Sequence, residues 1–480
     1  MLLTYKFEVN LNNKQSIILG HLCYAASKLF NVANYERKEY KSLGFDVVPD
    51  WYDQKKRLKD NIWYKSLPSQ TAQEVLKVLD KSWKSYYVLH RKWEYKKEHN
   101  LVKENEGKPS SPYYKKDGTL SNVRYLSCGF KLMENKIRFM IPKTLKNHLK
   151  EKYNIEDEFF YIELKRSFEK IKEIEFSYIS SNKYKVYIVY EAPTKSLKED
   201  NGQYISIDIG LNNLLTLYDV RGKSIIYSGN SLKNTIYYYS KEIAKTKSKL
   251  DLSNPKSKHN TSKKLKRLYD LKNKRIDLII HRVTKEVINY CINNEISKVI
   301  IGDLSGILLA KKEFNNNKKK HRYNQNMHSL CFKRIYDYLS YKLQLMGIDF
   351  IKVNEAYSST TSPTSPMVSK EYSNKSNRVT RGLFKDGNMI YNSDVLGAFN
   401  IMRIYRQLNN LDFNISLKGL TCPKKECIPV TDQFLNEDYI NWNGKAGNVG
   451  VSGRNYPKGD ELFEFINQSI AKMLGNSITE

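Results

Sequence analysis

The sequence predicts a multidomain protein of the α+β class, and three observations support this prediction. The chain has 480 residues, more than a single domain usually contains. Its first half begins with a strand-like segment, continues with long helical stripes and then returns to strand-like segments. Its second half begins with three short apolar segments and then alternates helices with strands. The two halves therefore indicate two different architectures within one chain.

The first half has the pattern of a small β-barrel that is interrupted by helices. Residues 3–10 alternate between polar and apolar side chains and predict a strand. Apolar residues at helical spacing predict helices over 14–40 and 69–98, the second with Ser69 as its N-cap. After a loop rich in glycine, proline and serine, strand patterns resume near residue 120. The simplest topology joins the first strand to these later strands in one barrel.

The second half has the element order of an RNase H-like domain. Three short strands, YISIDIG, LLTLYDV and KSIIYSG, form a meander, and a basic helical region follows over about 231–295. The chain continues with the strand KVIIGDL, a helix over 326–346, the strand IDFIKVNEAY and the helix SDVLGAFNIMRIYRQL. A polar insert precedes the last helix, and the tail from about residue 411 is expected to be peripheral.

Two acidic residues interrupt apolar elements of this pattern and suggest a catalytic site. Asp208 lies inside the strand YISIDIG, where a buried charge is costly unless it is paired or bound to a metal. Asp394 opens a helix in which the small residues Gly397 and Ala398 permit close packing on the sheet. Structural interpretations also exist, because Asp208 would suit a hairpin turn and Asp394 a helix N-terminus. Hydrolysis of a phosphodiester by two Mg²⁺ ions needs several such carboxylates, gathered from different segments at one end of a sheet.

The third acid of such a site is either Asp303 or Glu355. Asp303 ends the strand VIIGD, and Glu355 ends the strand FIKVNE, so both would lie at an end of the sheet. A strand-end acid can also form an ordinary salt bridge. The spacing alone does not decide between the two residues.

The charge of the chain indicates a polyanionic partner. The net charge is +30, from 81 lysines and arginines against 51 aspartates and glutamates. A solvated, lysine-rich surface is the alternative, but the positive charge is concentrated over 241–275 and 311–322, which favours phosphate contacts. The chain has no apolar run long enough to span a membrane, and its start lacks the pattern of a signal peptide. We therefore expect a cytoplasmic protein that has no membrane partner.

The quoted motifs resemble one known family. The segments IDIGLNNLLTLYD, VIIGDLSGI and YNSDVLGAFNIMR are similar in order and spacing to the three RuvC motifs of transposon-encoded TnpB proteins and miniature, Cas12f-like type V CRISPR effectors. LFNVANYERKEY and SLPSQTAQEVLKVLDKSWKSYY resemble the family's recognition helices, and SLKGLTCPKKECIPV resembles its C-terminal segment. The resemblance covers nearly the whole chain. It implies a prokaryotic RNA-guided DNA endonuclease with one RuvC site, which binds guide RNA and target DNA as a monomer or as a homodimer on one guide.

The resemblance also implies a role for each part of the chain. The expected parts are a β-barrel wedge domain (1–12 and 101–195), a helical recognition insertion (13–100), a RuvC nuclease domain (200–357 and 392–410), a target nucleic-acid-binding insert (358–391) and a C-terminal segment (411–480).

The sequence departs from the family pattern at two places. Most members have a metal-binding glutamate at the position of Gly302, and the neighbouring Asp303 would face the opposite side of the strand. Glu355, in NEAYSS, matches an acid that some TnpB-like branches carry instead. We therefore favour Asp208, Glu355 and Asp394 as the catalytic, metal-binding residues, with Asp303 as the alternative third acid. Most members also hold zinc in the insert through two cysteine pairs, which are missing here, so we expect Mg²⁺ (two ions) and no zinc.

Candidate nucleic-acid contacts come from three places in the chain. On the first long helix, Asn31, Asn34 and Arg37 lie near one face and are candidates for contact with a duplex. Basic residues of the later helical region and of the insert are candidates for contact with phosphates: Lys263, Lys264, Lys266, Arg267, Lys274, Arg275, Arg378 and Arg381. A solvated helix face is the structural alternative for the residues of the helical region.

Two other functions stay open at this point. A nuclease-dead, RNA-guided DNA-binding repressor would result if no acid compensated for Gly302. A transposase or resolvase that acts without RNA would use the same RNase H-like fold. The orientation of Glu355 distinguishes the repressor from the RNA-guided nuclease. RNA that copurifies with the protein distinguishes the nuclease from a transposase or resolvase that acts without RNA.

Overall fold

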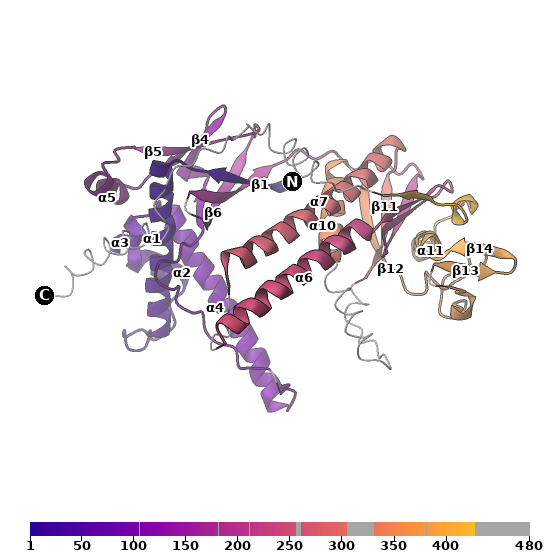
Figure 1. Ribbon diagram of the computed structural model, residues 1–480, viewed down its shortest axis with the longest axis horizontal. Coiled ribbons are helices and arrows are strands. Elements are labelled where there is room, and N and C mark those ends of the chain that lie inside the picture. The colour runs from indigo at the N-terminus through magenta and orange to yellow at the C-terminus, as the bar shows by residue number, and fades with distance from the viewer. Residues whose placement is uncertain are drawn as a thin grey trace. The chain divides into compact units, whose positions relative to one another are not determined.

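The computed structural model describes residues 1–427 except 105, 181, 211, 256–260, 305–330 and 381. The chain divides into two compact units, whose described residues are 1–192 and 193–427 (Figure 1). Both units combine helices with sheets, so the expected multidomain α+β class is confirmed. None of the described helices is long and apolar enough to cross a membrane.

The first unit contains two antiparallel sheets. The larger sheet has the order β1-β7-β6-β2, and the smaller has the order β3-β4-β5. The strands are β1 (Leu2–Asn10), β2 (Val123–Leu126), β3 (Phe130–Leu132), β4 (Lys136–Met140), β5 (Phe159–Glu163), β6 (Ile171–Ser180) and β7 (Lys183–Glu191). β1 pairs with β7 along its whole length, so the first strand joins strands that follow the helices. The expected strands are thus present, and their hydrogen bonds divide them between two sheets.

Most helices of the first unit lie between β1 and β2 in the sequence. The α-helices are α1 (Asn13–Lys38), α2 (Trp51–Arg57), α3 (Ile62–Lys65), α4 (Ser69–Glu98) and α5 (Lys143–Tyr153). A capping box begins α1, because the side chains of Asn12 and Gln15 each accept a hydrogen bond from the other's backbone N–H. The expectation that Ser69 caps α4 is wrong: Pro68 occupies that position, and Ser69 is the first helical residue. α5 lies between β4 and β5 and was not expected.

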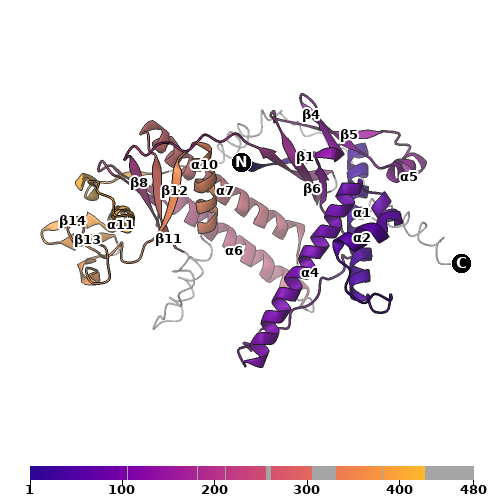
Figure 2. The same ribbon diagram turned by 180° about the vertical axis from the view of Figure 1, so that it is seen from behind.

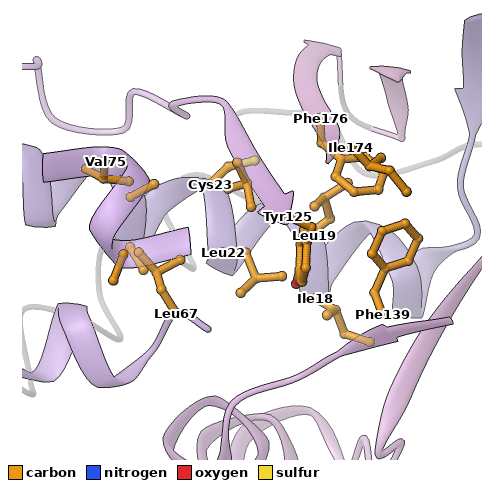
Figure 3. Packing of buried hydrophobic residues seen from close by; sticks show 14 of the residues in the cluster. Ile18, Leu19, Leu22, Cys23, Leu67, Val75, Tyr125, Phe139, Ile174 and Phe176 are labelled. Atoms are coloured by element: carbon orange, nitrogen blue, oxygen red, sulfur yellow. The ribbon is translucent and has the colours of Figure 1, made fainter. Parts of the chain in front are cut away.

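One hydrophobic core joins the helices and both sheets of the first unit. Figure 3 shows Leu19 and Leu22 of α1 near Tyr125 of β2. The ring of Phe139 in the smaller sheet meets the ring of Phe176 in the larger sheet edge-on, with 5.1 Å between their centroids. Such edge-to-face pairs add to the stabilisation from burial. Aromatic side chains from the two sheets therefore share a single core with α1.

The second unit is built on a mixed sheet with the order β12-β11-β8-β9-β10-β15. The strands are β8 (Tyr204–Ile209), β9 (Asn213–Asp219), β10 (Ser224–Ser228), β11 (Lys298–Asp303), β12 (Asp349–Asn354) and β15 (Lys424–Glu426). β8, β11 and β12 are parallel, whereas β9 is antiparallel to β8 and β10, so the carboxyl ends of β8, β11 and β12 meet at one edge. β15 pairs with β10 at the edge of the sheet, so residues 424–426 of the expected peripheral tail form a strand that the sequence did not predict.

Helices cover both faces of this sheet. They are α6 (Asn230–Ser253), α7 (Lys263–Asn293), α10 (Phe332–Leu345) and α11 (Ser393–Leu408). Odd-numbered residues of β8 and β11, such as Ile207 and Ile301, share a core with α7 and α10. Even-numbered residues, such as Tyr204 and Ile300, share a core with α11 on the other face. The two faces are therefore clearly distinguished by residue parity along these strands.

The basic helical region contains a pair of helices, and the polar insert contains a hairpin. α6 and α7 run side by side (Figures 1 and 2), with Tyr239 of α6 packed in a small core with Leu265 of α7. In the insert, β13 (Leu383–Asp386) pairs with β14 (Met389–Asn392) just before α11 begins. The hairpin thus leads directly into the helix that covers one face of the sheet.

Candidate metal site

Asp208 lies near the carboxyl end of β8, on the face that α11 covers. Two residues earlier on the same face, the hydroxyl of Ser206 donates a hydrogen bond to the backbone oxygen of Ala398 at 2.6 Å. A Cβ atom on Gly397 would lie 2.9 Å from Oδ2 of Asp208. The absence of a side chain at Gly397 therefore allows α11 to approach this carboxylate closely.

Glu355 follows β12 and reaches the space beside Gly302 of β11. Ile351 and Val353 of β12 pack on the α11 side of the sheet, and alternation along the strand directs Glu355 to the same side. A Cβ atom on Gly302 would lie 2.2 Å from Oε2 of Glu355 and 2.9 Å from Cδ1 of Ile401. The carboxylate of Glu355 therefore occupies the space into which a side chain at position 302 would point.

Asp394 belongs to the first turn of α11 and is held from two sides. The side chain of Asn392 caps the helix by accepting hydrogen bonds from the backbone N–H groups of Asp394 and Val395, at 3.1 and 3.2 Å. Nδ2 of Asn213 donates a hydrogen bond to Oδ2 of Asp394 at 2.5 Å. Asn213 begins β9, so this hydrogen bond joins α11 to the strand pair that carries Asp208.

Asp303 lies next to this group but on the other side of its strand. Val299 and Ile301 of β11 pack in the core with α7 and α10, and alternation assigns Asp303 to that side. Its negative charge still contributes to the raised pKa of Glu355. The geometry therefore favours Glu355 over Asp303 as the third acid, and this choice stays a prediction.

Burial and nearby negative charges raise the pKa values of Asp208 and Glu355. Burial, followed by the charges of Glu355 and Asp394, raises the pKa of Asp208 well above its usual range, whereas Arg378 opposes the shift. Burial, followed by the charge of Asp303, raises the pKa of Glu355 to about 7. Oε2 of Glu355 is also buried without a hydrogen-bond partner in the structure. A bound cation would relieve both the repulsion and the missing partner.

The carboxylate oxygens suit Mg²⁺, although the three acids are not arranged around a single ion position in the structure. No group of three or more His, Cys, Asp or Glu side chains in the described residues is arranged around a single ion. Carboxylate oxygens are the ligands that Mg²⁺ prefers, and it completes its shell with waters and substrate phosphate oxygens. The buried and unpartnered Oε2 of Glu355 is an oxygen of this kind. The residues present therefore fit Mg²⁺ by their chemistry.

The free energy of unfolding of the metal-free protein should fall as the pH rises from about 4.5 to about 7. The folded protein binds the Glu355 proton more tightly than the unfolded chain, because the pKa of Glu355 is raised from 4.5 to about 7. This stabilisation is fully present when the pH is below the Glu355 pKa of the unfolded chain, and it is lost as the pH rises through the Glu355 pKa of the folded protein. It amounts to at most about 3 kcal/mol. Glu355→Gln should flatten the profile when urea unfolding is measured in EDTA at pH 5 and pH 7.5. An equally steep profile in that variant would contradict the assignment.

Two of the candidate duplex contacts on α1 are buried and already bonded. Nδ2 of Asn34 donates to the backbone oxygen of Pro112 at 2.9 Å, and its Oδ1 accepts from Nε1 of Trp83 at 2.9 Å. Arg37 is 3% exposed and forms an ion pair with Asp80 at 3.0 Å. These bonds hold α1 against α4, so neither side chain is available to a duplex in this structure. The expectation for Asn34 and Arg37 is corrected accordingly.

Asn31 is also engaged by the protein backbone. Its Nδ2 donates to the backbone oxygen of Lys115 at 2.8 Å, and its Oδ1 accepts from the backbone N–H of Lys115 at 2.7 Å. Both ends of the side-chain amide are therefore used to hold the loop that carries Lys115. A duplex would have to replace these bonds in order to be read by Asn31.

The basic candidates of the second unit differ in their surroundings. The residues at the start of α7 are exposed, namely Lys263, Lys264, Lys266 and Arg267. Lys274 pairs with Asp270 at 2.9 Å, and the guanidinium of Arg275 lies 5.5 Å from the ring centroid of Tyr239. Arg378 lies within electrostatic reach of Asp208. Arg381 and the basic segment 311–322 lie outside the described residues.

Sequence reasoning missed three polar residues that lie next to the acids or to the insert. Asn213 holds Asp394, and Asn400 and Arg403 of α11 bond to the backbone of the insert. A signal for the last two was present, because they are polar residues one turn apart in an otherwise apolar stretch of helix. Asn213 had no comparable signal, because asparagine is common in turns.

Two models of known families match parts of the chain. Residues 187–308 match the family OrfB_IS605, described as probable transposase, and residues 332–401 match the TNB domain of Cas12f1-like proteins. No curated protein matches the chain.

Solved structures resemble the chain only distantly. The Cas12f1–sgRNA–target DNA complex is 15% identical, with a TM-score of 0.31, and the match covers 83% of this chain and 98% of that one. The mini-RNA-guided endonuclease CRISPR-Cas_phi3 is 10% identical, with a TM-score of 0.40, and the match covers 84% of this chain and 92% of that one. Scores this low carry no conclusion about the site. The two family models do confirm the resemblance that the motifs predict: residues 187–308 and 332–401 are similar to TnpB-type proteins and to miniature, Cas12f-like type V CRISPR effectors.

Proposed function

We propose that this protein is an RNA-guided DNA endonuclease with a single RuvC-type site formed by Asp208, Glu355 and Asp394. The observation that carries the proposal is the position of the acids: Gly397 and Gly302 leave room for the carboxylates of Asp208 and Glu355 on the face of the sheet that α11 covers, and Asp394 lies in the first turn of α11. The strand order, in which a meander is followed by two strands parallel to β8, supports an RNase H-like domain. The family relation supplies the guide RNA and the target DNA as the proposed partners.

The proposed organisation assigns one task to each part of the chain. A wedge domain (1–12 and 101–195) with its helical recognition insertion (13–100) would bind guide and target, and the RuvC domain (200–357 and 392–410) would cut. The insert (358–391) would contact the target nucleic acid through Arg378, whose charge also reaches Asp208. In such an enzyme, base pairing selects the sequence while the protein holds the backbone. The exposed lysines at the start of α7 suit that second task.

In the proposed mechanism the three acids bind Mg²⁺, and the surrounding residues fix their geometry. Bound Mg²⁺ would polarise the scissile phosphate and lower the pKa of the attacking water. Asn213 keeps the carboxylate of Asp394 directed toward β9. Asp208 and Glu355 must be deprotonated to bind metal, so their raised pKa values predict that metal binding releases protons. Glu355 turns toward the α11 face, which argues against a site that has lost its third acid.

The experiment that tests this proposal begins with the RNA that copurifies with the full chain. We expect sequencing to find one defined RNA species. The protein with that RNA, given a matching DNA target, should cut in Mg²⁺ and not in EDTA. Guided binding without cutting at any Mg²⁺ concentration would instead support the nuclease-dead repressor.

A second candidate function is a transposase that acts without RNA. The observation that favours it is the description of the family matched over residues 187–308 as probable transposase. The same fold and the same acids would serve DNA strand transfer. Purified protein that carries no RNA and cuts or joins DNA ends without a guide would support this candidate over the first.

A further inference from the structure

Two buried polar residues of α11 bind the backbone of the chain segment that follows Glu355. Nδ2 of Asn400 donates hydrogen bonds to the backbone oxygens of Ser358 and Thr361, at 2.7 and 2.8 Å. Nη1 of Arg403 donates to the backbone oxygen of Ser362 at 2.9 Å, and its Nη2 donates to that of Ser365. The two side chains thus capture four backbone oxygens within eight residues of the insert.

The two side chains also hold each other. Nη1 of Arg403 donates a hydrogen bond to Oδ1 of Asn400 at 2.9 Å. Asn400 is 0% exposed and Arg403 is 3% exposed. Burial lowers the pKa of Arg403 to about 10, so the guanidinium stays charged at neutral pH. A buried charge is tolerated only when its hydrogen-bonding groups are satisfied, and the backbone oxygens of the insert satisfy them here.

The bonded segment is continuous with the third acid. The backbone N–H of Ser358 donates to the backbone oxygen of Glu355 at 3.1 Å, so the first captured residue also closes a turn on the acid itself. Tyr357, between them, has a left-handed φ of 68°. Asn400 lies about 9 Å along α11 from Asp394, at a rise of about 1.5 Å per residue. The same helix therefore carries one acid and anchors the loop that carries another.

We propose that Asn400 and Arg403 are positioning residues that set the Glu355 carboxylate relative to Asp394. We call the pair the α11 clamp. This inference rests on the proposed function, because it concerns the metal site of that reaction. The hydrogen bonds of the clamp restrict the segment after β12 by attaching it to a helix. A metal ligand that lies outside a helix or strand needs such supporting bonds to keep its orientation. Without the clamp, Glu355 would sample orientations in which its carboxylate no longer fills the space beside Gly302.

The first test measures the loop itself and needs no enzymatic activity. Hydrogen exchange of the backbone amides of 355–365 is compared between the full-length wild type and Asn400→Ala. Arg403→Lys serves as a milder variant that keeps the charge but loses the fork of donors. We expect faster exchange in this segment in both variants, with unchanged exchange in β8 and β11. Unchanged exchange in 355–365 would overturn the clamp, whether or not the protein cuts DNA.

The second test separates positioning from a general loss of folded protein. The Mg²⁺ concentration that gives half-maximal guided cleavage should rise about 10- to 100-fold in Asn400→Ala, as for other residues that orient metal ligands. The rate at saturating Mg²⁺ should recover more fully than in Glu355→Gln. A lower rate with an unchanged Mg²⁺ requirement would indicate a purely structural role and overturn the inference. If the wild type does not cut, Mn²⁺ binding measured by calorimetry replaces cleavage as the readout.

Arg406→Ala is the matched control for both tests. Arg406 lies on the same helix, three residues after Arg403, and donates to the backbone oxygen of Phe413 at 3.1 Å. The Arg406→Ala substitution therefore removes a guanidinium that bonds to the backbone outside the insert. We expect the Mg²⁺ requirement and the exchange of 355–365 to match the wild type. A shift equal to that of Asn400→Ala would show that any weakening of α11 has this effect, which would overturn a specific clamp.

Discussion

Asp208→Asn should lower the rate of guided DNA cleavage by about 10³-fold or more, because electrostatic stabilisation of the transition state is usually the largest catalytic contribution. The affinities for guide RNA and target DNA should stay within about twofold of the wild type. The substitution removes a carboxylate from the centre of the acidic group but keeps its shape. Binding should survive because the exposed basic residues at the start of α7 belong to a helix that packs on the opposite face of the sheet from α11.

The same variant should also be at least as stable as the wild type when metal is absent. Burial and the charges of Glu355 and Asp394 raise the pKa of Asp208, so the ionised form destabilises the metal-free fold. A neutral asparagine removes that cost. Thermal unfolding in EDTA checks this expectation and shows that lost cleavage is not lost folding. Asp412→Asn, which changes an exposed acid of the same unit, should cut normally. Full cleavage by Asp208→Asn would refute the site.

The second large effect is expected at the pair formed by Glu355 and Gly302. Glu355→Gln should reduce cleavage by about 10²- to 10³-fold, the scale expected when one electrostatic contact to the transition state is lost. Gly302→Ala should also reduce cleavage, because its Cβ would lie 2.2 Å from Oε2 of Glu355 and the carboxylate would have to leave. The bulk of the new methyl group would act through Glu355, so the two single changes should not be additive.

A double change provides the decisive comparison. Gly302→Glu combined with Glu355→Ala moves the carboxylate back to β11 while freeing the space that it needs. We expect this variant to recover at least about tenfold of the activity that Glu355→Ala loses, which corresponds to about 1.4 kcal/mol. Cleavage rates at several Mg²⁺ concentrations measure the recovery. If Glu355→Gln cuts like the wild type and Asp303→Asn does not, then Asp303 is the third acid.

Local pattern predicted most elements of the second unit well. The meander, the strands β11 and β12 and the helix α11 follow from apolar periodicity, which reports burial of one side or both sides of an element. The alternating pattern did not predict α5, and it did not predict that the short segment Lys424–Glu426 would pair with β10. A three-residue edge strand depends on the partner that it meets, and that partner is almost two hundred residues earlier in the chain.

The candidate interface on α1 was predicted poorly for a related reason. Asn34 and Arg37 look like exposed polar residues on a helix, and polar residues usually are exposed. Their partners Trp83 and Asp80 belong to α4, which covers that face. Burial of a polar side chain depends on what packs against it, and the sequence of α1 does not show that α4 covers this face.

The sequence by itself predicted the two acids that belong to regular elements and the family resemblance that the family models confirm. Asp208 and Asp394 stand out because each is an acid in an apolar element with small residues nearby, which is a local signal. Only the tertiary structure gives a geometric reason to favour Glu355 over Asp303, and this choice stays a prediction. It depends on the register in which Gly302 pairs with Val353, and on the space that the missing side chain leaves for a carboxylate from the next strand. Strand register and packing depend on two segments that are distant in the chain, so they cannot be predicted from the pattern of either segment alone.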